Sequence, residues 1–224
     1  MPFEHSSKSR LTCRDLARFP EDTLLHRIGR VVAAVEFLPR KELFESWEMA
    51  RRIRRRLRGG RVVDLASGHG LLAMILMILD DTSPCALAVD TKIPENAARL
   101  LSAIEAAWPR LVGRIQLEER SIGEVDLTST DLIVSSHACG NLTDQILDRA
   151  ISVHARVAVL PCCHAEGRCD PGGLGGWLDT ALAIDVTRAA RLRSHGYRIS
   201  TQHIPGNITP KNRLLLGVPE NRDV

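Results

Sequence analysis

The chain alternates between short apolar runs and longer segments in which apolar and polar positions mix. Residues with the length and composition of buried strands form RVVDLA, ALAVD, RIQLEE, DLIVSS and RVAVLP. Between them lie the helix candidates LLAMILMIL, PENAARLLSAIEAA and LTDQILDRAI. Strands and helices in alternation predict an α/β fold, a parallel sheet doubly wound with helices on both faces.

Both ends of the chain depart from this alternation. The first sixty residues have helical patterns, LARFPEDTLLHRIGRVVAAV with an interruption at Pro20 and then residues 40–58 before Gly59 and Gly60, which predicts an N-terminal helical cap over 1–58. At the other end, GYRISTQHI and NRLLLGV are too close for a crossover helix between them. They predict a C-terminal antiparallel hairpin that completes a mostly parallel seven-stranded sheet within a main domain over 59–224.

Length and composition set the class of protein. With 224 residues and 44% hydrophobic content, the chain can bury the core of one main domain. No run has the roughly 18 apolar residues of a membrane span, and the first residues lack the apolar region of a signal peptide, so we expect a cytoplasmic protein without a membrane segment. We expect the six cysteines to be reduced thiols.

The positive charge is concentrated in one segment. The net charge is only +3, yet RRIRRRLRGGR at 51–61 contains seven arginines and no acid. Such a field attracts polyanions, which makes RNA a candidate partner. The alternative is a solvated helix face, because Ile53 and Leu57 are four residues apart and can dock while the arginines stay in water.

The segment VVDLASGHGLLAM at 62–74 joins a strand to a helix through a glycine-rich turn. Gly68 and Gly70 allow positive φ or close approach of a ligand, and the helix that follows points free N–H groups above the strand. With Ala73 and Asp90, the turn formally fits a dinucleotide fingerprint. That fingerprint has no role for Asp64, whereas S-adenosylmethionine carries an ammonium group that a carboxylate can hold. A purely structural turn is the third interpretation.

DLASGHG, Asp90 and the closing hairpin together resemble class I S-adenosylmethionine-dependent methyltransferases, whose first motif is an acid-x-Gly-x-Gly-x-Gly turn. Ala66 replaces the first glycine, which is a mild departure unless φ at this position is positive. The resemblance implies S-adenosylmethionine as cofactor. The candidate cofactor-binding residues are Asp64, Ala66, Ser67, Gly68, Gly70, Asp90, Ser121 and Ser136.

A narrower resemblance covers about residues 40 to 218. It is carried by SSHACGNLTD at 135–144, VLPCCH at 159–164 and ITPKNRLLLG at 208–217. These stretches are similar to the family that includes eukaryotic acceptor-stem tRNA 2′-O-methyltransferases and glutathione S-transferase C-terminal-domain-containing proteins. The eukaryotic tRNA enzymes carry zinc-finger segments that this chain lacks, so a tRNA substrate does not follow directly.

Two loops are expected to face the methyl group. The strands DLIVSS and RVAVLP end into HACG and CCH, and ligands of doubly wound sheets bind at these carboxyl ends. The candidate catalytic residues are His137, Asp144, Cys162 and His164. A histidine or Asp144 would serve as general base if the acceptor is a hydroxyl. In the alternative, these side chains only cap or fill their loops.

The cysteines have three interpretations. Cys139, Cys162, Cys163, His164 and Cys169 lack the usual C-x₂₋₄-C spacing of zinc sites, so we expect no metal. Two thiols on neighbouring strands are similar to those of RNA 5-methylcytosine enzymes, but the Pro-Cys step of those enzymes is missing at Ala138. Packing of small side chains around the ligands is the preferred interpretation.

The sequence therefore predicts an S-adenosylmethionine-dependent methyltransferase with RNA, including tRNA, as the favoured acceptor. A small-molecule or protein acceptor is the alternative, and a non-catalytic module that binds the cofactor or RNA is a further one. The complete set of Asp64, Gly68, Gly70 and Asp90 argues against lost activity.

Overall fold

A seven-stranded sheet forms the centre of the molecule. The computed structural model describes residues 3–164 and 167–220. The strands are β1 (Val62–Leu65), β2 (Ala86–Asp90), β3 (Ile115–Glu119), β4 (Leu132–Ser135), β5 (Arg156–Val159), β6 (Tyr197–His203) and β7 (Arg213–Pro219). Their order is β3-β2-β1-β4-β5-β7-β6, and β7 runs antiparallel to both of its neighbours. The α/β fold, the doubly wound sheet and the antiparallel hairpin are confirmed.

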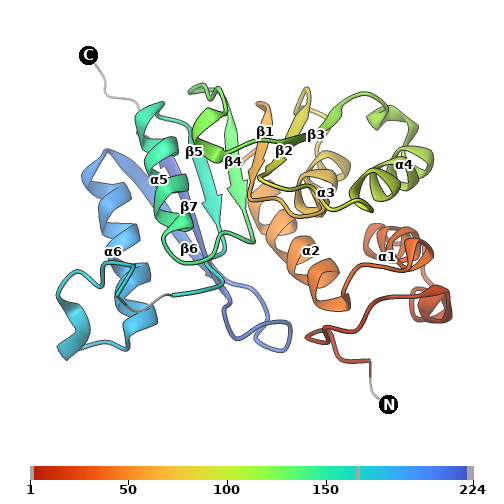
Figure 1. The fold of residues 1–224 in the computed structure, drawn as a ribbon, viewed down its shortest axis with the longest axis horizontal. Coiled ribbons are helices and arrows are strands. Elements are labelled where there is room, and N and C mark those ends of the chain that lie inside the picture. The colour runs from red at the N-terminus through yellow and green to blue at the C-terminus, as the bar shows by residue number, and fades with distance from the viewer. Residues whose placement is uncertain (1–2, 165–166, 221–224) are drawn as a thin grey trace.

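Helices cover both faces of the sheet (Figure 1). They are α1 (Leu24–Val35), α2 (Arg40–Arg54), α3 (Leu71–Leu79), α4 (Ala97–Ala107), α5 (Leu142–Ser152) and α6 (Thr180–Ser194). One hydrophobic cluster joins α1, α2, α3 and α4 to the sheet, and a second joins α5 and α6 to the opposite face. None of the helices in the described ranges is both long and apolar enough to cross a membrane.

The central strands β1, β2 and β4 are buried on both sides because each side meets helices. Val62, Ala88 and Val134 belong to the first cluster, whereas their neighbours Val63 and Val89 belong to the second. Parallel pairing of β1 with β2 and β4 brings these alternating positions into register. Continuous apolar runs are therefore needed in place of the apolar–polar alternation of a half-exposed sheet.

The N-terminal helices share the core of the sheet. Ile28 of α1 and Met49 of α2 are fully buried in the same cluster as Met74 of α3. The second helix ends at Arg54, four residues earlier than the pattern predicts, because its last turn gives way to a loop. A boundary between a cap at 1–58 and a domain at 59–224 stays a prediction; the packing joins the two parts through one core.

Helix α6 does not follow from the hydrophobic pattern. Its buried face contains Ile184, Arg188 and Leu192, which are four residues apart. An arginine at the centre of the stripe hides the helical period in the sequence. Arg188 is only 2% exposed, so the helix buries a charge where an apolar residue is usual.

Candidate cofactor and acceptor site

The turn between β1 and α3 takes the left-handed backbone conformation three times. Ala66, Gly68 and Gly70 have φ of +55°, +55° and +74°. A β-carbon at Gly70 would lie 3.0 Å from Leu117 and 3.1 Å from Ala88, so this glycine also lets the helix approach the sheet. The turn therefore needs glycine chemistry at alternate positions, as the sequence predicts.

Ala66 is the exception in this turn. Replacement of the first glycine by alanine is mild only where φ is negative, and φ here is +55°. An L-residue in this region brings its β-carbon close to the following carbonyl and costs roughly 1–2 kcal/mol. The replacement is consequently a strained one, which the sequence does not reveal because it does not give the backbone angle.

Asp64 is fully buried below the turn. Its Oδ2 accepts a 3.3 Å hydrogen bond from the Ala73 N–H at the start of α3, while its Oδ1 has no partner among the described residues. Burial is the main cause that raises the pKa of Asp64 to about 8, and the nearby Asp90 and Glu42 carboxylates add to the shift. A cationic ligand group would relieve both the missing bond and the raised pKa.

Asp90 ends β2 and lies against the same turn. Its Oδ2 accepts a 2.9 Å hydrogen bond from the Gly68 N–H. The position fits the acid that holds ribose hydroxyls at the switch point of doubly wound sheets. The structure thus brings together Asp64, Gly68 and Asp90, three of the predicted cofactor residues.

Further polar atoms without partners lie along this edge. Ser67 follows β1, and Ser135 and Ser136 end β4; all three are buried, and their Oγ atoms have no partner among the described residues. Buried hydroxyls are normally hydrogen-bonded, so a group of free ones indicates a ligand or ordered water at this edge. The donor set, one carboxylate and neutral hydroxyls, fits a cation with hydroxyl groups such as S-adenosylmethionine.

Ser121 differs from the other predicted cofactor residues. It caps the short helix Ile122–Glu124, and its Oγ accepts a 3.4 Å hydrogen bond from the Gly123 N–H. The side chain is exposed and lies beyond β3, next to the edge strand. Its local role is a helix cap, and contact with a cofactor stays a prediction.

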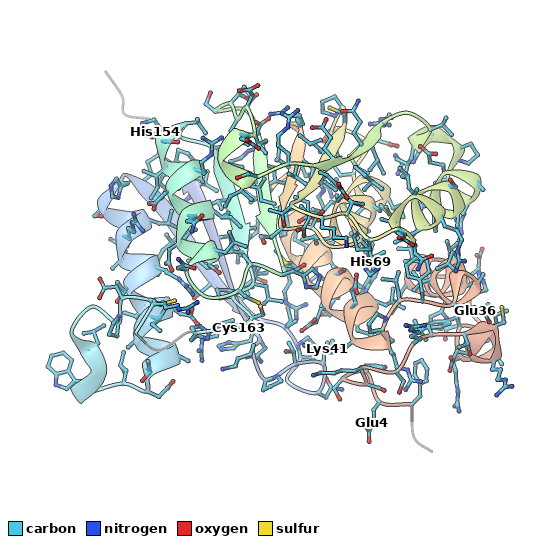
Figure 2. The ribbon with its side chains drawn as sticks, in the orientation of Figure 1. Glu4, Glu36, Lys41, His69, His154 and Cys163 are labelled. Carbon is cyan, nitrogen blue, oxygen red and sulfur yellow. The ribbon has the colours of Figure 1, made fainter. Side chains whose placement is uncertain are left out.

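The helical cap reaches the glycine turn through residues that sequence reasoning missed. His69 Nδ1 lies 3.2 Å from Oε1 of Glu42 in α2, and its ring is 5.2 Å from the ring of Phe37. Figure 2 shows His69 and Lys41 on the same side of the molecule. Both partners of His69 are distant from it in the chain, so only the packing of α2 on α3 could have indicated them.

The loops after β4 and β5 lie side by side. Cys139 and Cys163 form an isolated parallel bridge that extends the pairing of the two strands. His137 lies against the glycine turn, since a β-carbon on Gly68 would be 3.8 Å from its Cδ2. The expected meeting of the two loops near the turn is therefore observed.

Asp144 is held in a bidentate ion pair. Its two carboxylate oxygens accept hydrogen bonds from Nε and Nη2 of Arg188, both at 2.8 Å. Arg188 also donates to the Gly140 carbonyl at 3.0 Å, so it ties α6 to the loop after β4. Burial works to lower the pKa of Arg188, but the pair with Asp144 outweighs burial and raises it. Both oxygens of Asp144 thus accept a hydrogen bond from Arg188, and its role as a catalytic residue stays a prediction.

His164 makes a hydrogen bond that the sequence did not indicate. Its Nε2 lies 2.8 Å from Oδ1 of Asp185 in α6, and its buried Nδ1 has no partner among the described residues. Burial works to raise the pKa of Asp185, but hydrogen bonds from His164 and Arg213 outweigh it, and the pKa is lowered. An ionised carboxylate on one ring nitrogen leaves the other free to accept a proton, the arrangement of an oriented base.

Three cysteines converge beside these residues. The Sγ atom of Cys162 lies 3.1 Å from that of Cys139 and 3.8 Å from that of Cys163. Burial, and then its neighbouring thiols, raise the pKa of Cys162 well above its usual value. A thiol that keeps its proton is a poor nucleophile, so this environment disfavours attack on a base by Cys162.

The arginine segment lies at the opposite edge of the sheet. Arg156, the first residue of β5, donates to the carbonyls of Arg58 and Gly59, and Arg61 pairs with Asp131 just before β4. These interactions are at the amino ends of the strands. Figure 2 shows the two edges: His154 precedes β5 at one, and Cys163 follows β5 at the other.

Several arginines of this segment are already paired. Arg51 and Arg52 bind Glu48 within α2. Arg54 is 3% exposed and lies 3.0 Å from Asp80, and burial lowers its pKa only to about 10, so it stays charged. Neither interpretation of this segment, an RNA-binding surface or a solvated helix face, holds for Arg54, because its guanidinium is buried and paired with Asp80. The exposed arginines are Arg55, Arg56 and Arg58.

Comparisons with known proteins agree with this fold. The family model described as a methyltransferase domain matches residues 41–169. An O-methyltransferase family protein from Burkholderia thailandensis has TM-score 0.51 and 16% identity over 95% of this chain and 64% of that one. The S-adenosylmethionine-dependent methyltransferase SibL has TM-score 0.53 and 16% identity over 96% and 66%. The ribosomal protein L11 methylase from Lactobacillus delbrueckii subsp. bulgaricus has TM-score 0.50 and 16% identity over 81% and 79%.

This chain spans less than two thirds of the Burkholderia protein and of SibL. None of the curated proteins matches it significantly. The sheet order and the glycine turn define the class I methyltransferase fold, for which S-adenosylmethionine is the methyl donor. The chain belongs to the methyltransferase-domain family, since the family model covers more than half of it.

We expect Ala66→Gly to stabilise the protein. Removal of the left-handed alanine should raise the free energy of unfolding by roughly 1–2 kcal/mol. The greater freedom of glycine in the unfolded chain should lower it by roughly 0.4–1 kcal/mol. Urea unfolding should therefore show an increase in the free energy of unfolding of up to about 1.6 kcal/mol. The control is Ala73→Gly in the interior of α3, which should lose about 1 kcal/mol or more. Equal losses in the two variants would contradict the strain at Ala66.

Proposed function

We propose that the protein transfers a methyl group from S-adenosylmethionine to an acceptor bound between the loops at 136–144 and 160–164. The observation that carries the proposal is the buried Asp64 under a glycine turn, with one carboxylate oxygen that has no hydrogen-bond partner in the part of the chain that the structure describes. In this proposal, Asp64 interacts with the ammonium of the cofactor, directly or through water. Gly68 and Gly70 surround the amino-acid end, and Asp90 binds the ribose hydroxyls.

Ala66, Ser67, Ser121 and Ser136 complete the proposed cofactor site. Ser67 and Ser136 have buried free hydroxyls that suit the polar atoms of the cofactor. Ser121, at the end of β3, is assigned to the adenine side beyond Asp90, in keeping with the order of the strands. Each assignment rests on position at the carboxyl edge of the sheet.

The acceptor loops supply the groups that act on the acceptor. Methyl transfer from a sulfonium is an in-line displacement, so the main task is orientation. For a hydroxyl acceptor, we propose His164 as the general base, with Asp185 as the residue that positions its ring. His137, next to Gly68, lines the cofactor side, while Asp144 holds its loop through Arg188 and Cys162 lines the acceptor side.

RNA is the acceptor that the arginine-rich segment at 51–61 favours. Support in the structure comes from Arg55, Arg56 and Arg58, which are exposed. They lie at the far edge of the sheet, separated from the cofactor turn by α2. A helix of 15 residues is roughly 22 Å long, so an RNA would have to extend along it to reach both places.

A small-molecule acceptor is the second candidate, and a cavity favours it. The cavity has a volume of about 430 Å³ and lies between α6 and the strands β6 and β7. Pro161 at the end of β5 lines it, together with Asp185, the partner of His164, and Arg213. Its walls are mostly apolar with a few charged groups, which is typical of small-ligand sites.

We expect cofactor binding to release a proton from Asp64. Because its pKa is raised to about 8, the carboxyl is mostly protonated at pH 7 in the free protein, and a bound ammonium favours the ionised form. Affinity for S-adenosylhomocysteine should then rise from pH 6 toward pH 8. Calorimetry at pH 7 in buffers of different ionisation enthalpy should show release of about one proton.

Asp64→Asn is the matched variant for this measurement. It keeps the shape of the side chain and should abolish the proton release and the rise in affinity with pH. Asp148→Asn, at an exposed carboxylate paired with Arg191 on the other face, is the control that should change neither. Proton release that persists in Asp64→Asn would refute the assignment of Asp64.

We expect His164→Ala to lower the single-turnover rate of methyl transfer to a hydroxyl by roughly 10²–10⁴, because a general base contributes about that factor. Affinity for S-adenosylhomocysteine should stay unchanged, since a base acts on the acceptor. His137→Ala should instead weaken cofactor binding more than it slows transfer. If the two variants exchange these effects, His137 is the base; if both transfer normally, no histidine of these loops acts as base.

We expect charge reversal at Arg55, Arg56 and Arg58 to weaken binding of single-stranded RNA. The binding constant should also depend less on salt. The slope of its logarithm against the logarithm of the salt concentration should become less steep by about 0.7 for each phosphate that the variant no longer binds. The same reversal at the exposed Arg10, Arg14 and Arg18 is the control.

Transfer of label from tritiated cofactor into extract separates the acceptor classes. Label removed by ribonuclease supports RNA, whereas label that survives ribonuclease and protease in the small-molecule fraction supports the cavity.

A further inference from the structure

Cys139, Cys162 and Cys163 form a thiol cluster at the carboxyl edge of β4 and β5. All three Sγ atoms lie within 4.8 Å of one another. In the described ranges 3–164 and 167–220, these are the side chains of cysteine, histidine and acidic residues that lie close enough to share one metal ion. The cluster lacks the usual C-x₂₋₄-C spacing of zinc sites because its cysteines follow two adjacent strands, β4 and β5.

The backbone holds the three thiols in place. Cys139 and Cys163 pair as a parallel bridge, and the Gly140 N–H donates to the Cys163 carbonyl at 3.3 Å. Thr143 at the start of α5 donates its hydroxyl to the Ala138 carbonyl at 2.8 Å. The loop after β4 is thus fixed against the loop after β5, so the convergence of the sulfur atoms follows from the fold.

The sulfur separations suit a single d¹⁰ metal ion. A Zn–S bond of about 2.3 Å in tetrahedral geometry places two sulfur atoms about 3.8 Å apart. Cys162 and Cys163 are already separated by 3.8 Å, and Cys139 and Cys162, at 3.1 Å, would have to separate slightly. Thiolates are the soft ligands that select Zn²⁺ and Cu⁺ over harder ions.

We propose that the thiol cluster binds one thiophilic d¹⁰ ion, Zn²⁺ or Cu⁺, through three thiolates. Metal binding replaces the three thiol protons, which are released to solvent, and forms three metal–sulfur bonds without a change of oxidation state. Cys139 and Cys163 are exposed and Cys162 is half-buried, so an ion has access to the three thiols. The proposal does not depend on the proposed methyltransferase reaction.

The main competing interpretation is a redox pair. Cys139 and Cys162 are near enough to form a disulfide under an oxidant such as peroxide, which would leave Cys163 without a function. The convergence of three thiols, together with the backbone bridge that includes Cys163, favours the metal site. The two interpretations differ under strongly reducing conditions. A disulfide would then be reduced, whereas a metal site would still bind its ion.

Metal titration of the full chain tests this proposal. The protein is reduced, stripped with a chelator, exchanged into oxygen-free buffer that contains no thiol or phosphine, and titrated with Zn²⁺ and with Cu⁺ against a coloured competitor. We expect one ion per chain, and we expect Cys139→Ser and Cys163→Ser each to weaken binding by about 100-fold or more, the size of effect typical of changes at a metal site. Cys13→Ser and Cys85→Ser, at thiols outside the cluster, are the matched controls and should bind as the parent does.

Cobalt substitution gives a second readout. Co²⁺ in the site should produce near-ultraviolet thiolate-to-cobalt absorption that is lost in Cys139→Ser, while circular dichroism confirms that the variant is folded. Binding that survives both cluster variants, or no stoichiometric binding of either ion, would overturn the proposal. A Cys139–Cys162 disulfide in untreated protein without metal uptake after reduction would overturn it in favour of the redox pair.

Discussion

The buried guanidinium of Arg188 organises the acceptor half of the molecule. It is almost inaccessible to water, and it binds both oxygens of Asp144 and the Gly140 carbonyl, which belong to the loop after β4 and the start of α5. It also lies 3.3 Å from Asp185, which holds His164 after β5. Removal of one member of such a buried pair typically costs about 3–5 kcal/mol, because the other charge is left uncompensated. The geometry of two loops and one helix therefore depends on a single cation.

The cofactor half follows a different constraint, that of backbone conformation. Three left-handed residues in five positions turn the chain from β1 into α3 above a buried carboxylate. Two of the three are glycines, and the third is an alanine that the rest of the fold forces into a strained angle. Strain of this kind persists only where the surroundings determine the backbone, and here both β1 and α3 are fully packed on either side of the turn. The turn that we propose as the donor site is thus fixed by main-chain geometry, and the loops that we propose as the acceptor site are fixed by charge.

Local pattern was sufficient for most of the fold. The apolar runs identified every strand, and the short hairpin loop identified the antiparallel pair, because both signals act over a few residues. The pattern failed at α6, where Arg188 occupies a core position, and at Arg54, where a charge is buried with Asp80. The glycine turn and Asp90 were recognisable for the same local reason. Asp185 and Glu42 were not, because each meets its histidine partner only after the helices pack. The cysteines were recognised as neighbours, but the closeness of their sulfur atoms depends on the pairing of the two loops.

Under the proposed function, in which Asp64 holds the ammonium of the cofactor, its raised pKa has a consequence for turnover. The donor and the demethylated product carry the same ammonium at their amino-acid end, so a carboxylate that recognises this group attracts both ligands equally. Ionisation of Asp64 then raises the affinity for substrate and for product together, and it gives no preference for the charged sulfonium. Discrimination between donor and product has to come from the residues that face the sulfur of the cofactor, which in the proposed site belong to the acceptor loops. A protein built in this way is expected to be inhibited by its own product, and its throughput in a cell would follow the ratio of donor to product more closely than the amount of donor.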